Sequence, residues 1–226
     1  MAIDGPAGAG KSTVSRRTAE RLGFALVDTG ALYRAIALRA LEEGVSWDDG
    51  QELAALARRI SLRFVAAALA DEGPRLVVDG RDRSDDIRTP EVSQGASRVS
   101  RHPEVRAALL ALQRQLGADG GVVLEGRDIG TVVFPDAEVK VFLTASAEER
   151  ARRRTEELGL RGCPEHYDAV LAEIQERDHR DSTRPVAPLR PAPDAAELDS
   201  TGLELDAVVE AVVERVEAWR RRDVPG

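Results

Sequence analysis

Cysteine, histidine and long apolar runs are scarce in this sequence, and each shortage excludes a class of protein. The single cysteine, Cys163, excludes an internal disulfide framework and is typical of a reducing, cytoplasmic compartment. The three histidines, His102, His166 and His179, have no metal-ligand spacing with one another or with Cys163, so we expect no zinc site. No apolar run is long enough to span a membrane and no basic-then-apolar signal segment is visible, so we expect no membrane partner.

Lysine is also scarce, and arginine carries nearly all of the positive charge. The formal net charge is −8 at pH 7, which argues against nucleic acid as the main partner. Lys11 and Lys140 are the only lysines among the 32 basic residues, which leaves 30 arginines. Arginine clusters in an acidic chain predict focused recognition of a small anion, because the planar guanidinium binds phosphate through paired hydrogen bonds. We expect small-molecule substrates and a monomeric protein.

A complete phosphate-binding motif lies close to the first residue. It fits the pattern G-x-x-x-x-G-K-[ST] and, with the residue that follows, comprises Gly5, Pro6, Ala7, Gly8, Ala9, Gly10, Lys11, Ser12 and Thr13. Glycines let successive backbone N–H groups turn inward around a phosphate, and the positive end of the following helix points to the same place. Lys11 is expected to reach the β- and γ-phosphates, and the Ser12 hydroxyl to ligate Mg²⁺. The sequence therefore predicts a nucleoside-triphosphate site.

Apolar runs and turn residues alternate along the chain as is typical of an α/β protein. Its 226 residues suffice for one such domain with an elaboration. We expect strands at residues 2–4, 24–27, 121–124, 139–143 and 197–199, and helices at 11–22, 31–43, 49–59, 91–116 (interrupted at 102–103), 148–158, 164–177 and 205–219. Alternation between residues 61 and 80 predicts a small antiparallel unit in a side lobe. The charge-dense stretch 177–185 is expected to be a loop.

A phosphate-binding loop alone does not distinguish GTPases, ATPases and small-molecule kinases. The Asn-Lys-x-Asp motif that reads guanine is excluded, since Lys140 lies between Val139 and Val141. An ATPase needs a carboxylate after an apolar strand to hold the attacking water, and Glu125 meets that requirement. This alternative leaves a set of widely spaced arginines unexplained, namely Arg34, Arg106, Arg127, Arg177, Arg180 and Arg184.

Four ordered motifs give the sequence a specific resemblance that covers its whole length. They are residues 3–12 (IDGPAGAGKS), 28–34 (DTGALYR), 125–135 (EGRDIGTVVFP) and 176–184 (ERDHRDSTR). Together with the insertion near residues 61–80, they resemble bacterial cytidylate kinase, a P-loop nucleoside monophosphate kinase. The resemblance implies transfer of the γ-phosphoryl group of MgATP to CMP or dCMP in pyrimidine nucleotide metabolism.

The resemblance also implies an α/β fold in which helices flank five parallel strands. It divides the chain into a core (about 1–30, 117–148 and 190–226), a nucleoside-monophosphate-binding lobe that carries the antiparallel insertion (about 31–116) and a lid (about 149–189).

By resemblance, arginines hold the phosphates and carboxylates read the base. Arg34, Arg106 and Arg127 would hold the CMP phosphate, while Arg180 and Arg184 would close over the transferring group. The base and sugar would be contacted by Thr29, Ser97, Asp128, Arg177 and Asp181, and Arg184 would also touch the substrate. The catalytic set is then Lys11, Arg127, Arg180 and Arg184. The arginines within residues 150–154 suit a solvated helix face, from which one would stack on the adenine, and Arg153 is our candidate for the ATP-binding set. Glu125 would act on Mg²⁺ through water.

The same residues also permit plainer roles and other substrates. The segment 28–30 could serve only as a helix cap. Arg106 could be a solvated residue on a helix, and Arg127 could form a structural ion pair with Asp128. Another acceptor on the same scaffold, such as UMP, AMP or shikimate, is the nearest alternative. A nucleotide-binding ATPase whose arginines bind a partner is the alternative from a different class.

Overall fold

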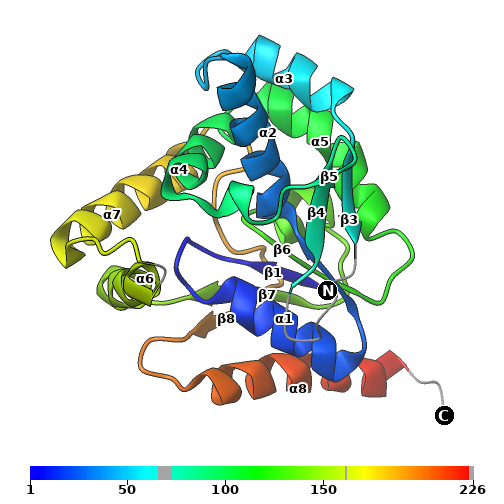
Figure 1. Ribbon diagram of the computed structural model, residues 1–226. Helices are drawn as coiled ribbons and strands as arrows, with labels where there is room; N and C mark the ends of the chain where they lie inside the picture. The colour runs from blue at the N-terminus through cyan, green and yellow to red at the C-terminus, as the bar shows by residue number, and fades with distance from the viewer. Residues whose placement is uncertain (66–72, 161, 224–226) are drawn as a thin grey trace. The chain divides into compact units, whose positions relative to one another are not determined.

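The computed structural model describes residues 1–65, 73–160 and 162–223 (Figure 1). The chain forms two compact units. The first unit comprises Met1–Ala25 and Glu125–Gly226, and the second comprises Leu26–Leu124.

Five strands form one sheet in the order β2-β6-β1-β7-β8. Their bounds are Ala2–Asp4 (β1), Ala25–Asp28 (β2), Val122–Gly126 (β6), Lys140–Thr144 (β7) and Ala196–Asp199 (β8). β1 runs parallel to β7 with Ala2 opposite Lys140, and β7 runs parallel to β8 with Val141 opposite Ala196. All residues of β1 and β6 are buried, as expected for central strands covered on both faces. The predicted α/β class with a parallel sheet is confirmed.

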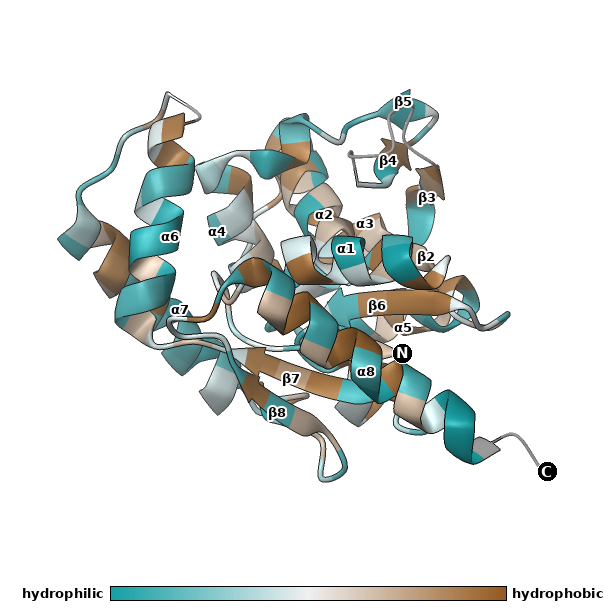
Figure 2. Cartoon of the chain, turned by 90° about the horizontal axis from the view of Figure 1, so that it is seen from below, coloured by the Kyte–Doolittle hydropathy of each residue, from teal (hydrophilic) through white to brown (hydrophobic). Residues whose placement is uncertain are grey.

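Along the chain, the helices of the first unit come between and after its strands. They are α1 (Lys11–Leu22), the short helical segment η2 (Ile129–Val133), α6 (Ala147–Leu160), α7 (Tyr167–Thr183) and α8 (Leu205–Asp223). Figure 2 shows the apolar strands β6 and β7, and α1 beside α8, a pair that is in contact. The apolar face of α8 is buried through Val208, Val209, Val212, Val213 and Val216.

The second unit contains four longer helices and a small antiparallel sheet. The helices are α2 (Thr29–Glu43), α3 (Gly50–Arg59), α4 (Pro90–Val99) and α5 (Pro103–Leu116), with the short turn η1 (Asp86–Arg88) before α4. The sheet has the order β3-β4-β5, formed by Leu62–Val65, Arg75–Val78 and Arg81–Asp82, so the predicted antiparallel unit is confirmed. Its core includes Leu32, Ile36, Leu53, Leu56 and Leu109, all essentially inaccessible to solvent.

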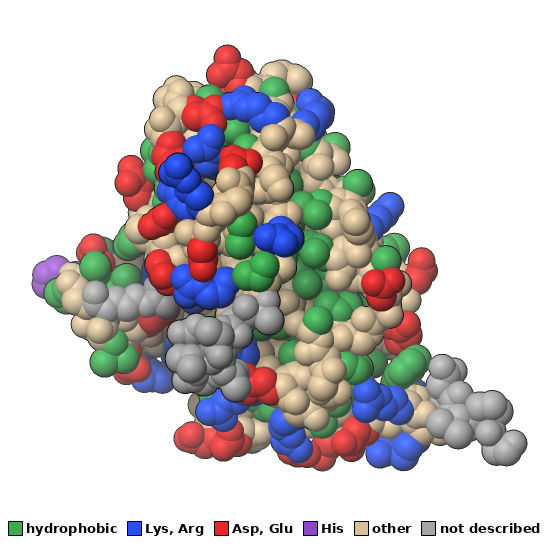
Figure 3. Space-filling view, turned by 45° about the vertical axis from the view of Figure 1, so that its right-hand side comes forward, with side chains coloured by type: hydrophobic (Ala, Val, Ile, Leu, Met, Phe, Trp, Pro, Cys, Tyr) green, Lys and Arg blue, Asp and Glu red, His purple; other side chains and the backbone are tan. Residues whose placement is uncertain are grey.

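Acidic and basic side chains are intermingled on the face drawn in Figure 3. In the second unit, Arg39 pairs with Glu42 and Glu43, and Arg83 pairs with Glu42 and Asp86. The Arg83–Glu42 pair links α2 to the segment just before η1, whereas the Arg39 pairs lie within α2. Exposed pairs of this kind contribute only about 0–1 kcal/mol each, so they adjust the surface and do not decide the fold.

One predicted loop is wrong. The stretch 177–185 is helical as far as Thr183, so α7 is longer at its C-terminal end than expected. Charge density suggested a loop, but the hydroxyls of Ser182 and Thr183 donate to carbonyls one turn back, at 2.7 and 2.6 Å, and these bonds fit a helix. The helix ends before Pro185, where Arg184 has the extended conformation (φ −61°, ψ 141°) that a residue before proline prefers.

The described residues include no helix with both the length and the apolar character that crossing a bilayer requires.

Candidate nucleotide site

The loop between β1 and α1 has the backbone of a phosphate-binding loop. Gly5 has φ +151°, and a Cβ at this position would lie 1.9 Å from the carbonyl oxygen of Leu143 in β7. Gly8 has φ +76°, and its Cβ would lie 3.1 Å from the Cβ of Arg150. Glycine is therefore required at Gly5 by contact and is favoured at Gly8 by conformation. The loop ends at the N-terminus of α1, where Ser12 and Thr13 are exposed.

Lys11 is the first residue of α1 and is buried. Its Nζ donates a hydrogen bond of 2.6 Å to the carbonyl oxygen of Pro6. Burial, together with the neighbouring Arg127 and Arg177 cations, lowers the pKa of Lys11 well below its usual value, although Glu125 opposes the shift. Lys11 is therefore close enough to both arginines to be repelled by them, at a helix N-terminus. An anion bound there would relieve their repulsion.

Asp4, at the end of β1, is a residue whose role the sequence did not predict. Its two carboxylate oxygens accept hydrogen bonds from the backbone N–H groups of Ile129 and Gly130, at 2.8 and 2.7 Å. Burial raises the pKa of Asp4 to about 6, and the two N–H groups limit that rise. The carboxylate thereby fixes the turn that carries Arg127 and Asp128. The signal in the sequence was an acid inside a buried strand.

The turn after β6 and the end of α7 meet in a cluster of buried charges. The Nε atom of Arg127 lies 3.2 Å from Oδ2 of Asp181, and Nη2 of Arg184 lies 3.9 Å from Oδ1 of Asp128. Burial alone would raise the pKa of Asp181, but Arg127, Arg177 and Arg184 outweigh it and hold that pKa below its usual value. Arg127 and Asp128 thus each contact a residue from the C-terminal end of α7, namely Asp181 and Arg184. The ion pair between Arg127 and Asp128 stays a prediction.

The other sequence-predicted residues of the first unit lie on or beside these elements. Glu125 is buried at the end of β6. Arg180 faces Glu176 of its own helix at 3.7 Å. Arg153 donates to Oγ and the carbonyl oxygen of Ser200, at 3.1 and 2.8 Å, and its Nη1 would lie 3.8 Å from a Cβ on Gly10. Arg153 therefore lies next to the phosphate-binding loop.

The second unit holds the remaining predicted residues on three helices. Asp28 caps α2 by accepting from the N–H of Ala31 at 3.2 Å, and it pairs with Arg34 at 2.5 Å. Burial alone would raise the pKa of Asp28, but Arg34 outweighs it and the pKa lies below its usual value. Thr29, the first residue of α2, is buried. The cap is confirmed, and Arg34 is held on the same carboxylate.

Arg106 and Ser97 are buried on α5 and α4 of the second unit. Arg106 is 8% exposed, so its interpretation as a solvated helix residue is wrong. It donates to the Ser100 carbonyl at 3.2 Å, and its guanidinium lies over the ring of Tyr33, 5.6 Å from the centroid. Ser97 Oγ is buried and has no hydrogen-bond partner among the described residues. A buried hydroxyl of this kind is available to a ligand.

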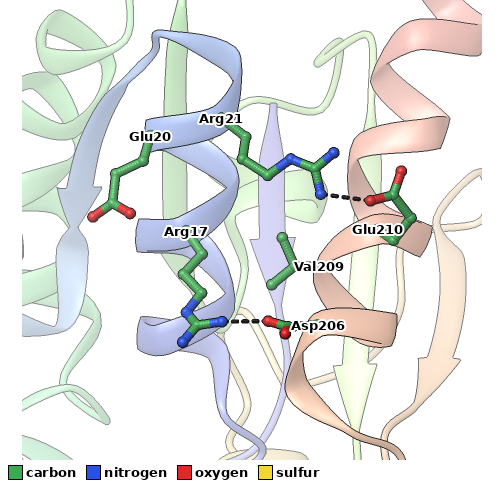
Figure 4. A pocket seen from close by; sticks show the side chains of 6 residues that line it. All are labelled: Arg17, Glu20, Arg21, Asp206, Val209 and Glu210. Carbon is green, nitrogen blue, oxygen red and sulfur yellow. Dashed lines mark hydrogen bonds and ion pairs between the residues drawn. The ribbon is translucent and has the colours of Figure 1, made fainter.

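A surface pocket in the first unit is lined by none of the sequence-predicted site residues. Figure 4 shows Arg17 and Arg21 of α1 pointing at Asp206 and Glu210 of α8, with Val209 between them. The charges are paired with each other, so the pocket joins two helices and offers little to a ligand. Within the described residues, no cluster of three or more His, Cys, Asp or Glu could hold a metal ion. A Mg²⁺ ion would therefore need oxygen ligands from a bound phosphate.

Comparison with known proteins gives a consistent result. The family model described as cytidylate kinase matches residues 1–218. A cytidylate kinase of Exiguobacterium sp. is 52% identical over 218 residues, 96% of each chain. One of Pseudomonas aeruginosa is 51% identical over 217 residues, which cover 96% of this chain and 94% of that one. A solved structure of an uncharacterized protein from Eubacterium ventriosum superposes with a TM-score of 0.54 at 11% identity, over 96% of this chain and 97% of the other, and shows a likeness of fold alone.

Proposed function

The chain belongs to the cytidylate kinase family, and from that premise we propose that it transfers the γ-phosphoryl group of ATP to CMP or dCMP. The products are ADP and CDP or dCDP. The structural observation that carries the proposal is buried Lys11, which lies at the N-terminus of α1 directly after the glycine loop, with Arg127 and Arg177 nearby. Such a group suits the charge that develops on a transferring phosphoryl group.

The chemistry needs positioning and charge neutralisation more than proton transfer. The acceptor phosphate has a second pKa of about 6, so it is largely ionised at neutral pH and requires no general base. Lys11, Arg127, Arg180 and Arg184 are our proposed catalytic cations. They would stabilise negative charge on both the donor and the acceptor as the phosphoryl group passes between them.

ATP is proposed to bind residues 5–13 through backbone N–H groups, Lys11 and the exposed Ser12 hydroxyl. The donor set fits Mg²⁺ carried by the phosphates, because Mg²⁺ typically uses phosphate oxygens, waters and one or two protein oxygens. Ser12 would ligate the ion, and Glu125 would act through water. When bound, Mg²⁺ neutralises charge on the phosphates. Arg153, which lies near Gly10, is proposed to stack on the adenine.

We propose that separate groups of residues bind the phosphate and the base of CMP. Arg34, Arg106 and Arg127 would hold its phosphate, since guanidinium groups bind phosphate oxygens in pairs. Asp128 and Asp181 would accept from the cytosine N4 amino group, with Arg177 donating to the base. Thr29, Ser97 and Arg184 complete the proposed substrate set, and the orphan hydroxyl of Ser97 supports its inclusion.

The proposed roles of the three parts of the chain follow from these assignments. Residues of about 31–116 form the monophosphate-binding lobe, residues of about 149–189 form a lid that excludes water, and the rest form the core. We propose a monomer in the cytoplasm that acts on these small molecules.

Release of ADP, measured across a panel of acceptors with MgATP, tests the function. CMP and dCMP should support rapid release, whereas UMP, AMP, shikimate and no acceptor should give little. Equal rates with UMP or AMP would assign another acceptor to the same scaffold. Release that does not depend on any acceptor would support the ATPase alternative.

A further inference from the structure

Arg150 differs from its neighbours on α6 in what it contacts. Arg152 pairs with Glu149 and Glu156, and Arg154 pairs with Glu157, all within the same helix. Arg150 is 5% exposed and extends to three other places in the first unit. Nothing in the sequence distinguishes it from the arginines that follow it.

The guanidinium of Arg150 makes four hydrogen bonds. Nε donates to the Ala145 carbonyl at 2.9 Å, and Nη1 donates to the Ala7 carbonyl at 3.1 Å. Nη1 and Nη2 also donate to the two carboxylate oxygens of Asp178, at 3.0 and 2.6 Å. Four of its five N–H groups are used in one plane, a geometry that lysine cannot reproduce. Arg150 thus joins the phosphate-binding loop to α7.

Both ends of this connection belong to segments that the proposed function uses. Ala7 follows Pro6, whose carbonyl accepts from Lys11, so the two peptide groups that Lys11 and Arg150 hold are adjacent. A Cβ built on Gly8 would lie 3.1 Å from the Cβ of Arg150 and 3.3 Å from its carbonyl oxygen, so Gly8 packs closely against Arg150. A change in the loop therefore acts directly on the first turn of α6.

The other end of the connection sets the rotation of α7. Arg177 and Asp181 are four residues apart and share one face of the helix, whereas Asp178 points about 100° away from Arg177 and about 60° away from Asp181. The apolar cluster Ala151, Leu158, Val170 and Ile174 packs α6 against α7, but apolar packing is not directional. The paired bonds to Asp178 supply direction, and so fix where Arg177 and Asp181 point.

We propose that Arg150 is a positioning residue which, through Ala7 and Asp178, transmits occupancy of the phosphate-binding loop to α7. The inference rests on the proposed function, because it takes the loop as the ATP site and α7 as the carrier of substrate-binding residues. Arg150 itself contacts neither substrate in this scheme. It aligns the helix that does.

The test compares Arg150→Lys and Asp178→Asn with the unaltered protein. Amide hydrogen exchange is measured in peptides from residues 5–13 and 167–183, with and without adenylyl imidodiphosphate and Mg²⁺. In the unaltered protein the nucleotide should slow exchange in both segments. In both variants it should still protect 5–13, while protection of 167–183 is lost. The kcat should fall about tenfold to hundredfold, with KM for ATP changed less than about threefold.

Two controls separate positioning from general damage. Arg152→Gln removes an arginine of the same helix that pairs only within α6, and should behave like the unaltered protein. Asp178→Glu keeps the carboxylate and should restore most of the protection of α7. Asp178 has a 28% exposed side chain, so Asp178→Asn carries the test even where Arg150→Lys fails to fold.

Two results would overturn the inference. One is Asp178→Asn with an unchanged response in 167–183. In the other, Arg150→Lys raises KM for ATP by as large a factor as it lowers kcat, while Asp178→Asn changes neither constant. That result would make Arg150 a direct ATP contact. If the unaltered protein neither protects 5–13 nor phosphorylates CMP, the proposed function fails first, and that outcome is visible before any variant is compared.

Discussion

Arg127 and Asp181, 54 positions apart in the chain, form an ion pair with Nε 3.2 Å from Oδ2. The carboxylate of Asp181 is buried, and surrounding arginines hold its pKa below its usual value. An ionised, buried carboxylate is a strong acceptor for an amino group and a poor neighbour for a carbonyl. This pair therefore joins an arginine that we propose to bind the CMP phosphate to a carboxylate that we propose to read the base.

Asp181→Asn should reduce discrimination between CMP and UMP. Uracil has a carbonyl where cytosine has its N4 amino group, and an amide can donate to that carbonyl. The CMP/UMP ratio of kcat/KM should fall about tenfold to hundredfold, the effect of one hydrogen bond to a charged group, with the loss mainly on CMP. Asp128→Asn should act in the same direction.

The matched control for base reading is Asp168→Asn, on the exposed first turn of α7. It should leave the ratio unchanged. Equal losses for CMP and UMP in both Asp128→Asn and Asp181→Asn would mean that these carboxylates organise the site without reading the base.

Lys11→Met should have opposite effects on activity and stability. Loss of the cation removes stabilisation of developing phosphoryl charge and should lower kcat about 10²–10³-fold. The depressed pKa of Lys11 means that its protonated form is penalised in the folded state, so removing it should leave the thermal midpoint unchanged or raise it. Near-normal turnover in the folded variant would take the loop out of the mechanism.

Asp4 should give the free energy of unfolding a characteristic pH dependence. Its pKa is about 6 when folded, against an ordinary value of 3.8. Between these values the folded protein binds more protons than the unfolded chain, so this residue makes stability fall as pH rises through the window and stay level above it. Two pKa units correspond to about 3 kcal/mol.

Asp4→Asn isolates this contribution in urea titrations at pH 4, 5, 6 and 7. As pH rises from 4 to 7, the unfolding free energy of Asp4→Asn should increase relative to that of the unaltered protein. Other carboxyls cancel in the comparison. Parallel curves would show that Asp4 does not titrate in this range. The variant should also raise KM for CMP, since one N–H of the turn after Asp128 loses its acceptor.

Gly5→Ala should destabilise the protein far more than Gly23→Ala. Both residues have positive φ, but a Cβ on Gly5 would lie 1.9 Å from the Leu143 carbonyl, whereas one on Gly23 meets nothing within 4 Å. Gly23→Ala should cost about 1 kcal/mol from backbone strain alone. Denaturant unfolding of the two variants gives the comparison. Equal losses would show that the contact at Gly5 relaxes without cost.

Local signals made much of the fold predictable. The bounds of α1, Lys11–Leu22, are those expected, because the glycine loop precedes the helix and Gly23 caps its end. Alternating side chains gave the antiparallel pair β3 and β4. The C-terminal end of α7 was not predicted, because its dense charge is typical of a loop. In the structure this stretch is helical, and the hydroxyls of Ser182 and Thr183 donate hydrogen bonds to carbonyls one turn back.

Contacts between distant segments were beyond sequence reasoning. Arg127 and Asp128 are adjacent in the chain, yet they pair with Asp181 and Arg184. The hydrogen bonds of Asp4 to Gly130 and of Arg150 to Ala7 join residues 126 and 143 positions apart. Neighbouring residues predict local geometry, but they carry no information about such partners.

The most direct test of the central claim follows the γ-phosphoryl group itself. The protein is incubated with Mg²⁺, CMP and ATP labelled in the γ-phosphate, and the labelled products are separated. The account predicts label in CDP, one per ADP formed, and little label in inorganic phosphate. Label that appears in inorganic phosphate at the same rate with and without CMP would contradict it.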